Sequence, residues 1–512
     1  MATKRRGLQV MRAVLVANRG EIACRVLRAC REAGLRAVAV HAEDEAGALH
    51  TELADISLPL GGSGAPAYLN GDAIIAAALA NDVDAIHPGF GFLSERAGFA
   101  QAVLDAGLIW VGPSPSAIDR MGDKMTARIT MREAGVPVIP GEEIEIESTG
   151  DEDADLAATL TAVRDASARV GFPLLLKASA GGGGKGMRAV ESADGLDEAV
   201  RGARREAIAA FGDGRVYLER LLRGARHVEV QVLADAHGTT VHLGERECSV
   251  QRRHQKVFEE APCAVVDHEQ RQRMGEAAIA AAEAVNYVGA GTVEFLMEDD
   301  GTFHFLEMNT RIQVEHPITE LVTGVDLVRE QLRIAAGEPM TVPDFAMRGH
   351  AIEVRIYAED AANGFLPSIG PLAVFRPPTG PGLRLDTGVR EGDEVSPSYD
   401  PMLAKLIAHA PSRAEALQRM RRALDDFVIL GTTTNVAFLR DLCDLEAVTS
   451  AKTSTTTLDE AYPNGWAPRP ASEAVLALGA VLASARSSRP TGGEAGPAGP
   501  SSPFLSLSRR YP

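Results

Sequence analysis

The chain of 512 residues lacks the features that define several large classes of protein. Its five cysteines are odd in number and form no Cys-x-x-Cys pair; they are Cys24, Cys30, Cys248, Cys263 and Cys443. This argues against a disulfide framework or a zinc site and favours a reducing compartment, so we expect a cytoplasmic protein. No apolar run approaches ~18 residues, so no membrane span is expected. Met1–Val10 has no long apolar core, so it is not a secretory signal.

The chain also lacks a basic surface composition, because its net charge is −18. That charge argues against nucleic acid or an acidic membrane as the main partner. Lysine is scarce while arginine is abundant; the lysines are Lys4, Lys124, Lys177, Lys185, Lys256, Lys405 and Lys452. Where arginine is the usual surface cation, a retained lysine suggests a need for a compact ammonium group.

One common nucleotide-binding motif is missing from the start of the chain. Ala13–Ala17, Ile22–Ala33 and Leu35–His41 are typical of a strand, a helix and a strand, which begin a doubly wound parallel sheet. No glycine-rich dinucleotide fingerprint follows the first strand, so no nicotinamide site is expected. The turn His87–Gly91 continues this pattern and is either an active-site wall or a packed turn.

The most informative stretch is Leu306–His316, in which apolar and polar residues alternate as in a strand. The polar face carries Glu307, Asn309, Arg311, Gln313 and Glu315. Fully extended, this face would span about 26 Å, which is too long for one reaction centre. We therefore expect a bend near Thr310–Arg311, with two adjoining subsites.

Apolar runs flank Asp299-Asp300-Gly301, which predicts a hairpin. If Asp300 and Gly301 form a two-residue loop, Glu294 lies opposite Glu307. Like charges opposite each other destabilise a sheet, and a divalent cation between them would remove that cost. Oxygen ligands from Glu294, Glu307 and Asn309 suit Mg²⁺ or Mn²⁺. The alternative is a solvated hairpin without a metal.

Two further stretches suggest anion binding. Ala178–Arg188 contains the glycines 181–184 between Lys177 and Lys185, and such a loop either cradles phosphates or is a flexible linker. It is not a Walker loop, because no Gly-Lys-Ser/Thr follows. Arg252, Arg253, His254 and Lys256 form a basic stretch that we interpret as an anion site rather than a basic surface loop. In contrast, Gly141–Ala158 is acidic and is predicted to be an exposed connection.

These motifs together resemble the biotin carboxylase family of the ATP-grasp superfamily. The resemblance runs from about Met11 to about Tyr462. The motifs that carry it are Ala17–Ala23, His87–Glu95, Met121–Lys124, the glycine loop, Cys248–Lys256, Glu307–Pro317 and Gly349–Ile356.

The resemblance implies an α/β (α+β overall) ATP-grasp fold. It would comprise a Rossmann-like domain at 11–122, an ATP-grasp domain at 123–339 with a mobile glycine-rich lid at about 139–221, and a C-terminal domain at 340–462. From about Ser484 the composition predicts a disordered tail over 484–512.

The resemblance also implies ATP-dependent carboxylation of biotin by bicarbonate, through carboxyphosphate. The groups implied to bind ATP are Lys124, Lys177, Gly181, Gly182, Gly183, Gly184, Glu219, Leu222, His227, Gln251 and His254. Glu294, Glu307 and Asn309 would hold Mg²⁺ or Mn²⁺. Bicarbonate would contact Lys256, Arg311, Gln313 and Val314, with Glu315 as general base and Arg355 stabilising the enolate-like ureido oxygen of biotin.

The expected partners are a biotin carboxyl carrier protein, a carboxyltransferase subunit and a second copy of the chain. No lysine follows Lys452, so the chain is expected to act on a separate carrier. The expected role is the first half-reaction of an acetyl-, propionyl- or other acyl-CoA carboxylase. Two alternatives stay open: another ATP-grasp ligase that joins a carboxylate to an amine, and a non-catalytic scaffold subunit.

Overall fold

The computed structural model describes residues 11–144, 146, 149–179, 187–342 and 346–470, together with 473, 474 and 477. Residues up to Trp466 form one unit and those from Ala467 form a second. The first unit carries every strand and helix named below. The glycines 181–184 and the tail from 484 lie outside the described residues.

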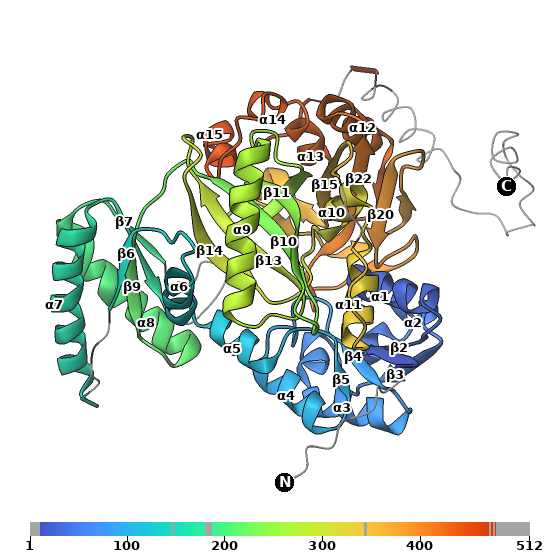
Figure 1. Ribbon diagram of the computed structural model, residues 1–512. Helices are drawn as coiled ribbons and strands as arrows, with labels where there is room; N and C mark the ends of the chain where they lie inside the picture. Colours follow the sequence, from blue (N-terminus) through green and yellow to red (C-terminus); the bar gives the residue numbers. More distant parts are fainter. Residues whose placement is uncertain are drawn as a thin grey trace, which may run out of the picture. The chain divides into compact units, whose positions relative to one another are not determined.

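The N-terminal part forms a five-stranded parallel sheet with the strand order β3-β2-β1-β4-β5 (Figure 1, blue). Its strands are β1 (Ala13–Val16), β2 (Arg36–His41), β3 (Ile56–Pro59), β4 (Ala85–His87) and β5 (Ile109–Trp110). Its helices are α1 (Gly20–Glu32), α2 (Leu49–Leu53), α3 (Gly71–Ala80), α4 (Ala97–Asp105) and α5 (Pro115–Gly122). The doubly wound sheet predicted from the sequence is confirmed.

The strand order reverses between β1 and β4, so the loops that follow these two strands meet at the carboxyl edge of the sheet. Asn18 joins the two loops, because its Nδ2 donates to the carbonyl oxygens of Pro88 and Phe90, both at 2.7 Å. The turn His87–Gly91 is thus tied to the turn that opens α1.

The second sheet is antiparallel and has the order β6-β9-β7-β8. It consists of β6 (Gly141–Glu143), β7 (Leu174–Ala178), β8 (Arg188–Val190) and β9 (Val216–Arg220), with the helices α7 (Glu152–Val170) and α8 (Leu196–Phe211). Apolar side chains from the two helices and the strands form one shared core.

The prediction of an exposed connection over Gly141–Ala158 is wrong. The segment contains β6 and the first two turns of α7. Asp151 caps α7 by accepting hydrogen bonds from the backbone N–H groups of Asp153 and Ala154. Acidic residues in a first turn also favour the helix through its dipole. The acidic residues of this segment therefore belong to the start of a helix rather than to a linker.

The largest sheet has eight strands in the order β14-β13-β10-β11-β12-β15-β22-β20, and every neighbouring pair is antiparallel. The strands are β10 (Arg226–Ala234), β11 (Thr240–Arg252), β12 (Gln255–Ala261), β13 (Gly289–Met297), β14 (Phe303–Asn309), β15 (His350–Tyr357), β20 (Leu383–Thr387) and β22 (Met402–Ala410). The sheet is continuous across residue 340, where the sequence predicts a domain boundary.

Helices cover both faces of this sheet. They are α6 (Lys124–Glu133), α9 (His268–Ala284), α10 (His316–Thr323), α11 (Leu327–Ala335), α12 (Arg413–Asp426) and α13 (Val436–Leu442). Figure 1 shows α9 lying along β10 and β13, where their apolar side chains form a shared core. Ile318 and Val322 of α10 pack on Ala351 and Ile407, whereas the alternate residues of β15 face the core that contains α12 and α13.

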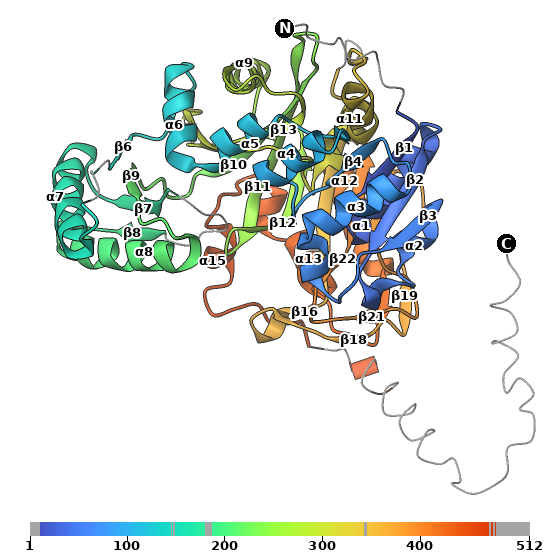
Figure 2. The same ribbon diagram turned by 90° about the horizontal axis from the view of Figure 1, so that it is seen from below.

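The C-terminal part also contains short ladders and helices. The ladders are β16 (Glu359–Asp360) with β17 (Leu366–Pro367), β18 (Gly370–Pro371) with β21 (Glu394–Val395), and β19 (Val374–Arg376) with β23 (Val428–Leu430). The last helices are α14 (Glu446–Thr449) and α15 (Thr457–Ala461). Figure 2 shows β16, β18, β19 and β21 grouped together.

The predicted hairpin forms, but its loop differs from the prediction. Met297 pairs with Phe303, and the turn closes through hydrogen bonds from Gly301 N to Glu298 O and from Glu298 N to Thr302 O. This is a three-residue loop rather than a two-residue one. A bulge beside Glu294 shifts the register by one residue and restores the predicted pairing of Glu294 with Glu307.

The expected bend is confirmed, because β14 ends at Asn309 and α10 begins at His316. All five cysteines are unpaired and buried. Among the described residues, no helix combines the length and the apolar character that crossing a bilayer requires.

The packing of the N-terminal part on the eight-stranded sheet can be tested at Gly388. A Cβ there would lie 2.4 Å from the carbonyl carbon of Gly20. We expect Gly388→Ala to lower the free energy of unfolding by about 1–3 kcal/mol, because backbone atoms cannot yield without separating α1 from β20. Thermal denaturation measures this. Gly98→Ala is the control, since no atom lies within 4 Å of its Cβ position; equal losses in both variants would contradict the packing.

Candidate active site

Four charged side chains form a row across four neighbouring strands of the eight-stranded sheet. Glu307 of β14 pairs with Glu294 of β13, which pairs with Glu229 of β10. Glu229 in turn pairs with Arg246 of β11. Directly opposite residues point to the same face, so the sheet presents three carboxylates and one guanidinium together.

Lys256 of β12 binds three carboxylates at once. Its Nζ lies 2.6 Å from Glu229 Oε2, 2.8 Å from Glu294 Oε1 and 2.7 Å from Glu315 Oε1. Burial alone would lower the pKa of Lys256, but the three negative charges raise it well above its ordinary value. Lys256 is therefore a permanent cation at the centre of a buried anionic cluster.

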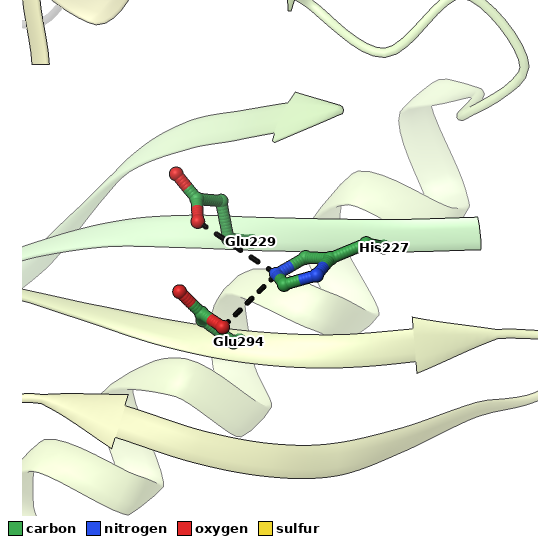
Figure 3. Close-up of side chains that lie close together, drawn as sticks. All are labelled: His227, Glu229 and Glu294. Carbon is green, nitrogen blue, oxygen red and sulfur yellow. Dashed lines mark ion pairs between the residues drawn. The ribbon is translucent and has the colours of Figure 1, made fainter. Parts of the chain in front are cut away.

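His227 of β10 points toward two of these carboxylates, Glu229 and Glu294 (Figure 3). Its Nε2 lies 3.0 Å from Glu294 Oε2 and 3.9 Å from Glu229 Oε2. Glu294 Oε1 also accepts hydrogen bonds from Asn309 Nδ2 at 2.8 Å and Gln313 Nε2 at 3.0 Å. Burial would raise the pKa of Glu294, but Lys256 and His227 hold it below its ordinary value. Lys256 and His227 thus compensate the negative charge of Glu294, for which the sequence analysis proposed a metal ion.

Arg246 is the cation of the row, and its side chain is fully buried. Its Nε lies 2.5 Å from Glu229 Oε1. Its remaining nitrogens donate to Gln231 Oε1, Thr292 Oγ1 and Thr319 Oγ1 at 2.8–3.0 Å. A guanidinium with this many partners fixes the position of Glu229.

Glu315 lies just before α10, between two cations. Its Oε1 accepts from Lys256, and its Oε2 lies 3.0 Å from Arg355 Nη2. Arg355 of β15 also donates through Nε to Glu259 Oε1 at 2.6 Å. Burial would raise the pKa of Glu315, but the charges of Lys256, Arg355 and Arg246 hold it well below its ordinary value. Glu315 is therefore ionised at neutral pH.

Arg311 connects this centre to the N-terminal part. Its Nε lies 2.9 Å from Glu95 Oε2, and its terminal nitrogens donate to Gln313 Oε1 and Asn309 Oδ1, each at 2.9 Å. The bend after β14 therefore brings Arg311 and Gln313 to the Glu294 end of the site.

Val314 is held by a lysine that the sequence analysis did not assign to the site. Lys405 of β22 is fully buried and donates from Nζ to the carbonyl oxygen of Val314 at 2.8 Å. The same Nζ lies 3.1 Å from Glu21 Oε1 of α1 and 3.8 Å from Asp386 Oδ2 of β20. A single ammonium thus links the loop before α10 to the N-terminal part.

Five of the predicted nucleotide residues have charged or polar partners, namely Lys124, Lys177, Glu219, His227 and Gln251. Lys177 of β7 pairs with Glu219 of β9, which also lies 2.9 Å from Arg128 Nη1 of α6. Gln251 Nε2 lies 2.8 Å from His227 Nδ1. Lys124 Nζ lies 3.8 Å from Glu307 Oε2.

Two other predicted nucleotide residues stand apart. His254 is exposed in the turn between β11 and β12, and Leu222 is half-buried after β9.

The basic stretch does not act as one cluster. Arg253 and His254 form the β11–β12 turn, with φ of 48° and 67°. Arg252 pairs with Glu359 at 3.3 Å and lies over the ring of Phe365, whereas Lys256 enters the carboxylate cluster. The hairpin sends neighbouring basic side chains to opposite faces, which sequence proximity alone does not reveal.

The donors around Glu307 fit a hard divalent cation. Glu307 and Glu294 are opposed carboxylates, and Asn309 adds an amide oxygen. The side chain of Glu307 is 41% exposed, with Lys124 as its nearest cation. An exposed carboxylate with one distant cation can accept a metal together with the phosphates of a nucleotide, and these three residues would hold it.

Several residues of the centre escaped the sequence analysis: Glu229, Arg246, Glu259, Glu353, Lys405, Glu21 and Glu95. Alternation along β10 was the available signal, because His227, Glu229 and Gln231 occupy one face of an otherwise apolar strand. No local pattern distinguishes Glu259 from the adjacent Glu260, which instead pairs with His350 and Arg413.

A large antiparallel sheet with opposed carboxylates, beside a smaller sheet that carries a lysine, defines an ATP-grasp enzyme. Residues 123–342 match the family "Carbamoyl-phosphate synthase L chain, ATP binding domain". Residues 10–118 match "Biotin carboxylase, N-terminal domain", and residues 353–460 match "Biotin carboxylase C-terminal domain". The chain belongs to the biotin carboxylase family.

Three known proteins illustrate the similarity. The biotin carboxylase of Nostoc sp. is 48% identical over 452 residues, which are 87% of this chain and 98% of that protein. The methylcrotonoyl-CoA carboxylase subunit alpha of Dictyostelium discoideum is 49% identical over 433 residues, 84% of this chain but 60% of that protein. The third is the biotin carboxylase domain dimer of Hydrogenobacter thermophilus 2-oxoglutarate carboxylase, solved with MgADP, ADP and bicarbonate. It has a TM-score of 0.84 and 42% identity, and the match covers 89% of this chain and 98% of that chain.

The charge balance of the centre can be tested at Arg246. We expect Arg246→Met to lower the free energy of unfolding by about 3–5 kcal/mol, because it leaves Glu229 buried without its guanidinium. Chemical or thermal denaturation measures the loss. Arg223→Met is the matched control, since Arg223 is 60% exposed and should contribute about 0–1 kcal/mol. A small effect at Arg246 would show that Lys256 alone compensates Glu229.

Proposed function

We propose that the chain carboxylates biotin with bicarbonate at the expense of ATP, as the biotin carboxylase subunit of an acyl-CoA carboxylase. The observation that carries the proposal is the buried set Lys256, Glu315 and Arg355. In it, the ionised carboxylate of Glu315 lies within hydrogen-bond distance of both a fixed ammonium and a guanidinium. Such a set can bind a small anion, remove its proton and stabilise a second developing negative charge.

ATP binds between the two antiparallel sheets, in our proposal. Lys124 and Lys177 contact its phosphates, and the glycines 181–184 are proposed to cover them. Glu219, Leu222, His227, Gln251 and His254 line the rest of the nucleotide site. Glu294, Glu307 and Asn309 would hold Mg²⁺ or Mn²⁺, which would supply charge neutralisation for the phosphates.

Bicarbonate is gripped by Lys256, Arg311, Gln313 and the backbone of Val314. In the free site, Lys256 and Arg355 compensate Glu315 and keep its pKa low. When bicarbonate takes over the contact of Lys256 with Glu315, the pKa of Glu315 rises and the carboxylate becomes a stronger base for the bicarbonate proton. The deprotonated anion attacks the γ-phosphorus of ATP, ADP leaves, and carboxyphosphate forms.

Carboxyphosphate then breaks down to CO₂ and phosphate beside biotin. The phosphate released in this step takes the proton of biotin N1; as N1 loses that proton and attacks CO₂, negative charge develops on the ureido oxygen. Arg355 is held by Glu259 on one side, so its guanidinium is oriented before biotin arrives. A fixed cation aimed at developing charge contributes about 3 kcal/mol to such a step.

We also propose the assembly. The three matched segments support the division into domains at 11–122, 123–339 and 340–462, and a lid at about 139–221 stays a prediction of the sequence. The dimeric relative supports a homodimer. A separate biotin carboxyl carrier protein and a carboxyltransferase subunit complete the reaction, and cytoplasmic location stays a prediction of the sequence.

Phosphate release from MgATP, with biotin and bicarbonate each added or withheld, tests the reaction class. We expect release to require bicarbonate and to rise with biotin, because bicarbonate supplies the nucleophile and biotin consumes CO₂. Release that is driven by an amine and unaffected by biotin would instead indicate another ATP-grasp ligase.

The base is tested with Glu315→Gln. We expect bicarbonate-dependent turnover to fall at least about 100-fold, because the amide cannot accept the proton. ATP binding, measured by equilibrium titration, should change less than about threefold. Exposed Glu338→Gln is the control. Loss of nucleotide binding in Glu315→Gln would assign this residue a structural role.

The metal site is tested with Glu307→Gln. We expect the Mg²⁺ concentration for half-maximal turnover to rise about tenfold or more, because one of two opposed carboxylate ligands is lost. Titration of turnover with Mg²⁺ at saturating ATP measures this. A variant whose deficit does not respond to added Mg²⁺ would place Glu307 outside the metal site.

A further inference from the structure

Two buried carboxyl groups lie side by side behind Arg355. Glu259 of β12 pairs directly with Glu353 of β15, so both side chains leave the same face of the sheet. Arg355 is two residues beyond Glu353 and shares that face. The face is covered by α10, whose Ile318 and Val322 pack on it.

Three oxygens of this pair lack partners among the described residues. Glu353 is fully buried, and neither of its carboxyl oxygens has a hydrogen-bond partner. Glu259 is also fully buried; its Oε1 accepts from Arg355 Nε, whereas its Oε2 has no partner. Buried polar atoms are almost always hydrogen-bonded, so these three oxygens require an explanation.

The nearby cations are already shared among several carboxylates. Arg355 is shared between Glu259 and Glu315, and Lys405 is engaged by Glu21, Asp386 and the carbonyl oxygen of Val314. The titratable residues of α10, which covers this face, are His316 and Glu320. Two adjacent ionised carboxylates would therefore leave an uncompensated negative charge in the interior.

The surroundings of both groups favour a bound proton. Burial raises the pKa of Glu353 well above its ordinary value, and Glu259 and Glu315 raise it further against the opposing charges of Lys405 and Arg355. Burial also raises the pKa of Glu259, to about 7, although Arg355 opposes the shift.

We propose that Glu259 and Glu353 share a single proton and together act as a positioning pair for Arg355. The proton resides on Glu353, whose O–H donates to Glu259 Oε2. That hydrogen bond satisfies an unpartnered oxygen and leaves one negative charge on the pair, which matches the guanidinium that Glu259 holds. The positioning role of this pair rests on the proposed function, in which Arg355 stabilises charge on biotin.

A second negative charge on the pair would oppose the reaction. Negative charge develops on the ureido oxygen when biotin loses its proton, and Arg355 is the group that stabilises it. Loss of the shared proton would place an extra buried anion beside Arg355 and weaken that stabilisation. A single shared proton therefore keeps the positive field of Arg355 directed at biotin.

Two isosteric substitutions separate the roles of the pair. Glu353→Gln replaces the O–H donor by an N–H donor, so kcat/KM for biotin should stay within about threefold of the wild-type value. Glu259→Gln removes the charge that orients Arg355 Nε, so kcat/KM for biotin should fall about 10–100-fold, with ATP binding retained. An equal loss in both variants would overturn the positioning role.

The proton itself is tested without any assay of turnover, by comparing Tm values of wild type and Glu353→Gln from pH 5 to 8. A raised carboxyl pKa in the folded state means that the folded protein holds a proton that the unfolded chain has released above about pH 4.3. Stability of the wild type then falls with rising pH relative to the variant. We expect Tm of Glu353→Gln minus Tm of wild type to grow by about 1–2 °C per pH unit.

The controls separate the two proposals. Exposed Glu338→Gln should run parallel to wild type at every pH. Glu259→Gln should keep the pH dependence of the wild type, because buried Glu353 still holds its proton. A constant difference for Glu353→Gln across this range would overturn the shared proton even if biotin carboxylation is observed. A growing difference without biotin-dependent phosphate release would support the pair while refuting the proposed function.

Discussion

The interaction on which the site depends is the contact of one buried ammonium with three carboxylates. Lys256 reaches Glu229, Glu294 and Glu315 at 2.6–2.8 Å, in surroundings where an uncompensated charge is strongly disfavoured. A compact ammonium can approach three anions from one point, whereas a planar guanidinium presents its donors in a fixed fork. This explains why a lysine stands here in a chain that otherwise uses arginine.

The same charge balance gives the site its chemical response. Each cation that would bind bicarbonate is already engaged by a carboxylate of the protein, so anion binding must release such a carboxylate. In the proposed reaction the released group is Glu315, and its pKa would rise when Lys256 turns from it to bicarbonate. Substrate binding and activation of the base thus follow from one exchange of partners. Glu229 does not change in this way, because Arg246 holds it independently.

The eight-stranded sheet makes this arrangement rigid. Glu307, Lys256, Arg355 and Lys405 stand on four strands of one continuous hydrogen-bonded sheet, which spans both the ATP-binding and the C-terminal segments. The separation between Glu307, a proposed metal ligand, and Arg355, the proposed biotin contact, is therefore set by strand spacing rather than by a hinge. The N-terminal part adds Glu95 from the turn after β4 and Glu21 from α1, and their pairing with Arg311 and Lys405 attaches it to the same centre.

Local patterns in the sequence were enough to find the helices and strands near the motifs, the bend after Asn309, and the facing pair Glu294 and Glu307. The alternation after Leu306 and the Asp-Gly turn are local signals. The loop is one residue longer than predicted, but the bulge beside Glu294 offsets that residue and keeps Glu294 opposite Glu307. The motifs also singled out Glu315, Lys256 and Arg355, which the structure brings together.

Tertiary structure alone decided which charges neutralise which. Lys256 and Glu315 are 59 residues apart, and Arg246 meets Glu229 across a hairpin in which either neighbour could have faced the other side. The roles of Glu259, Glu353 and Lys405 follow from strand register, because a shift of one residue would turn each of them into the opposite core. Sequence determines which chemical groups are present, but the compensation of buried charge depends on distances that only the folded sheet defines.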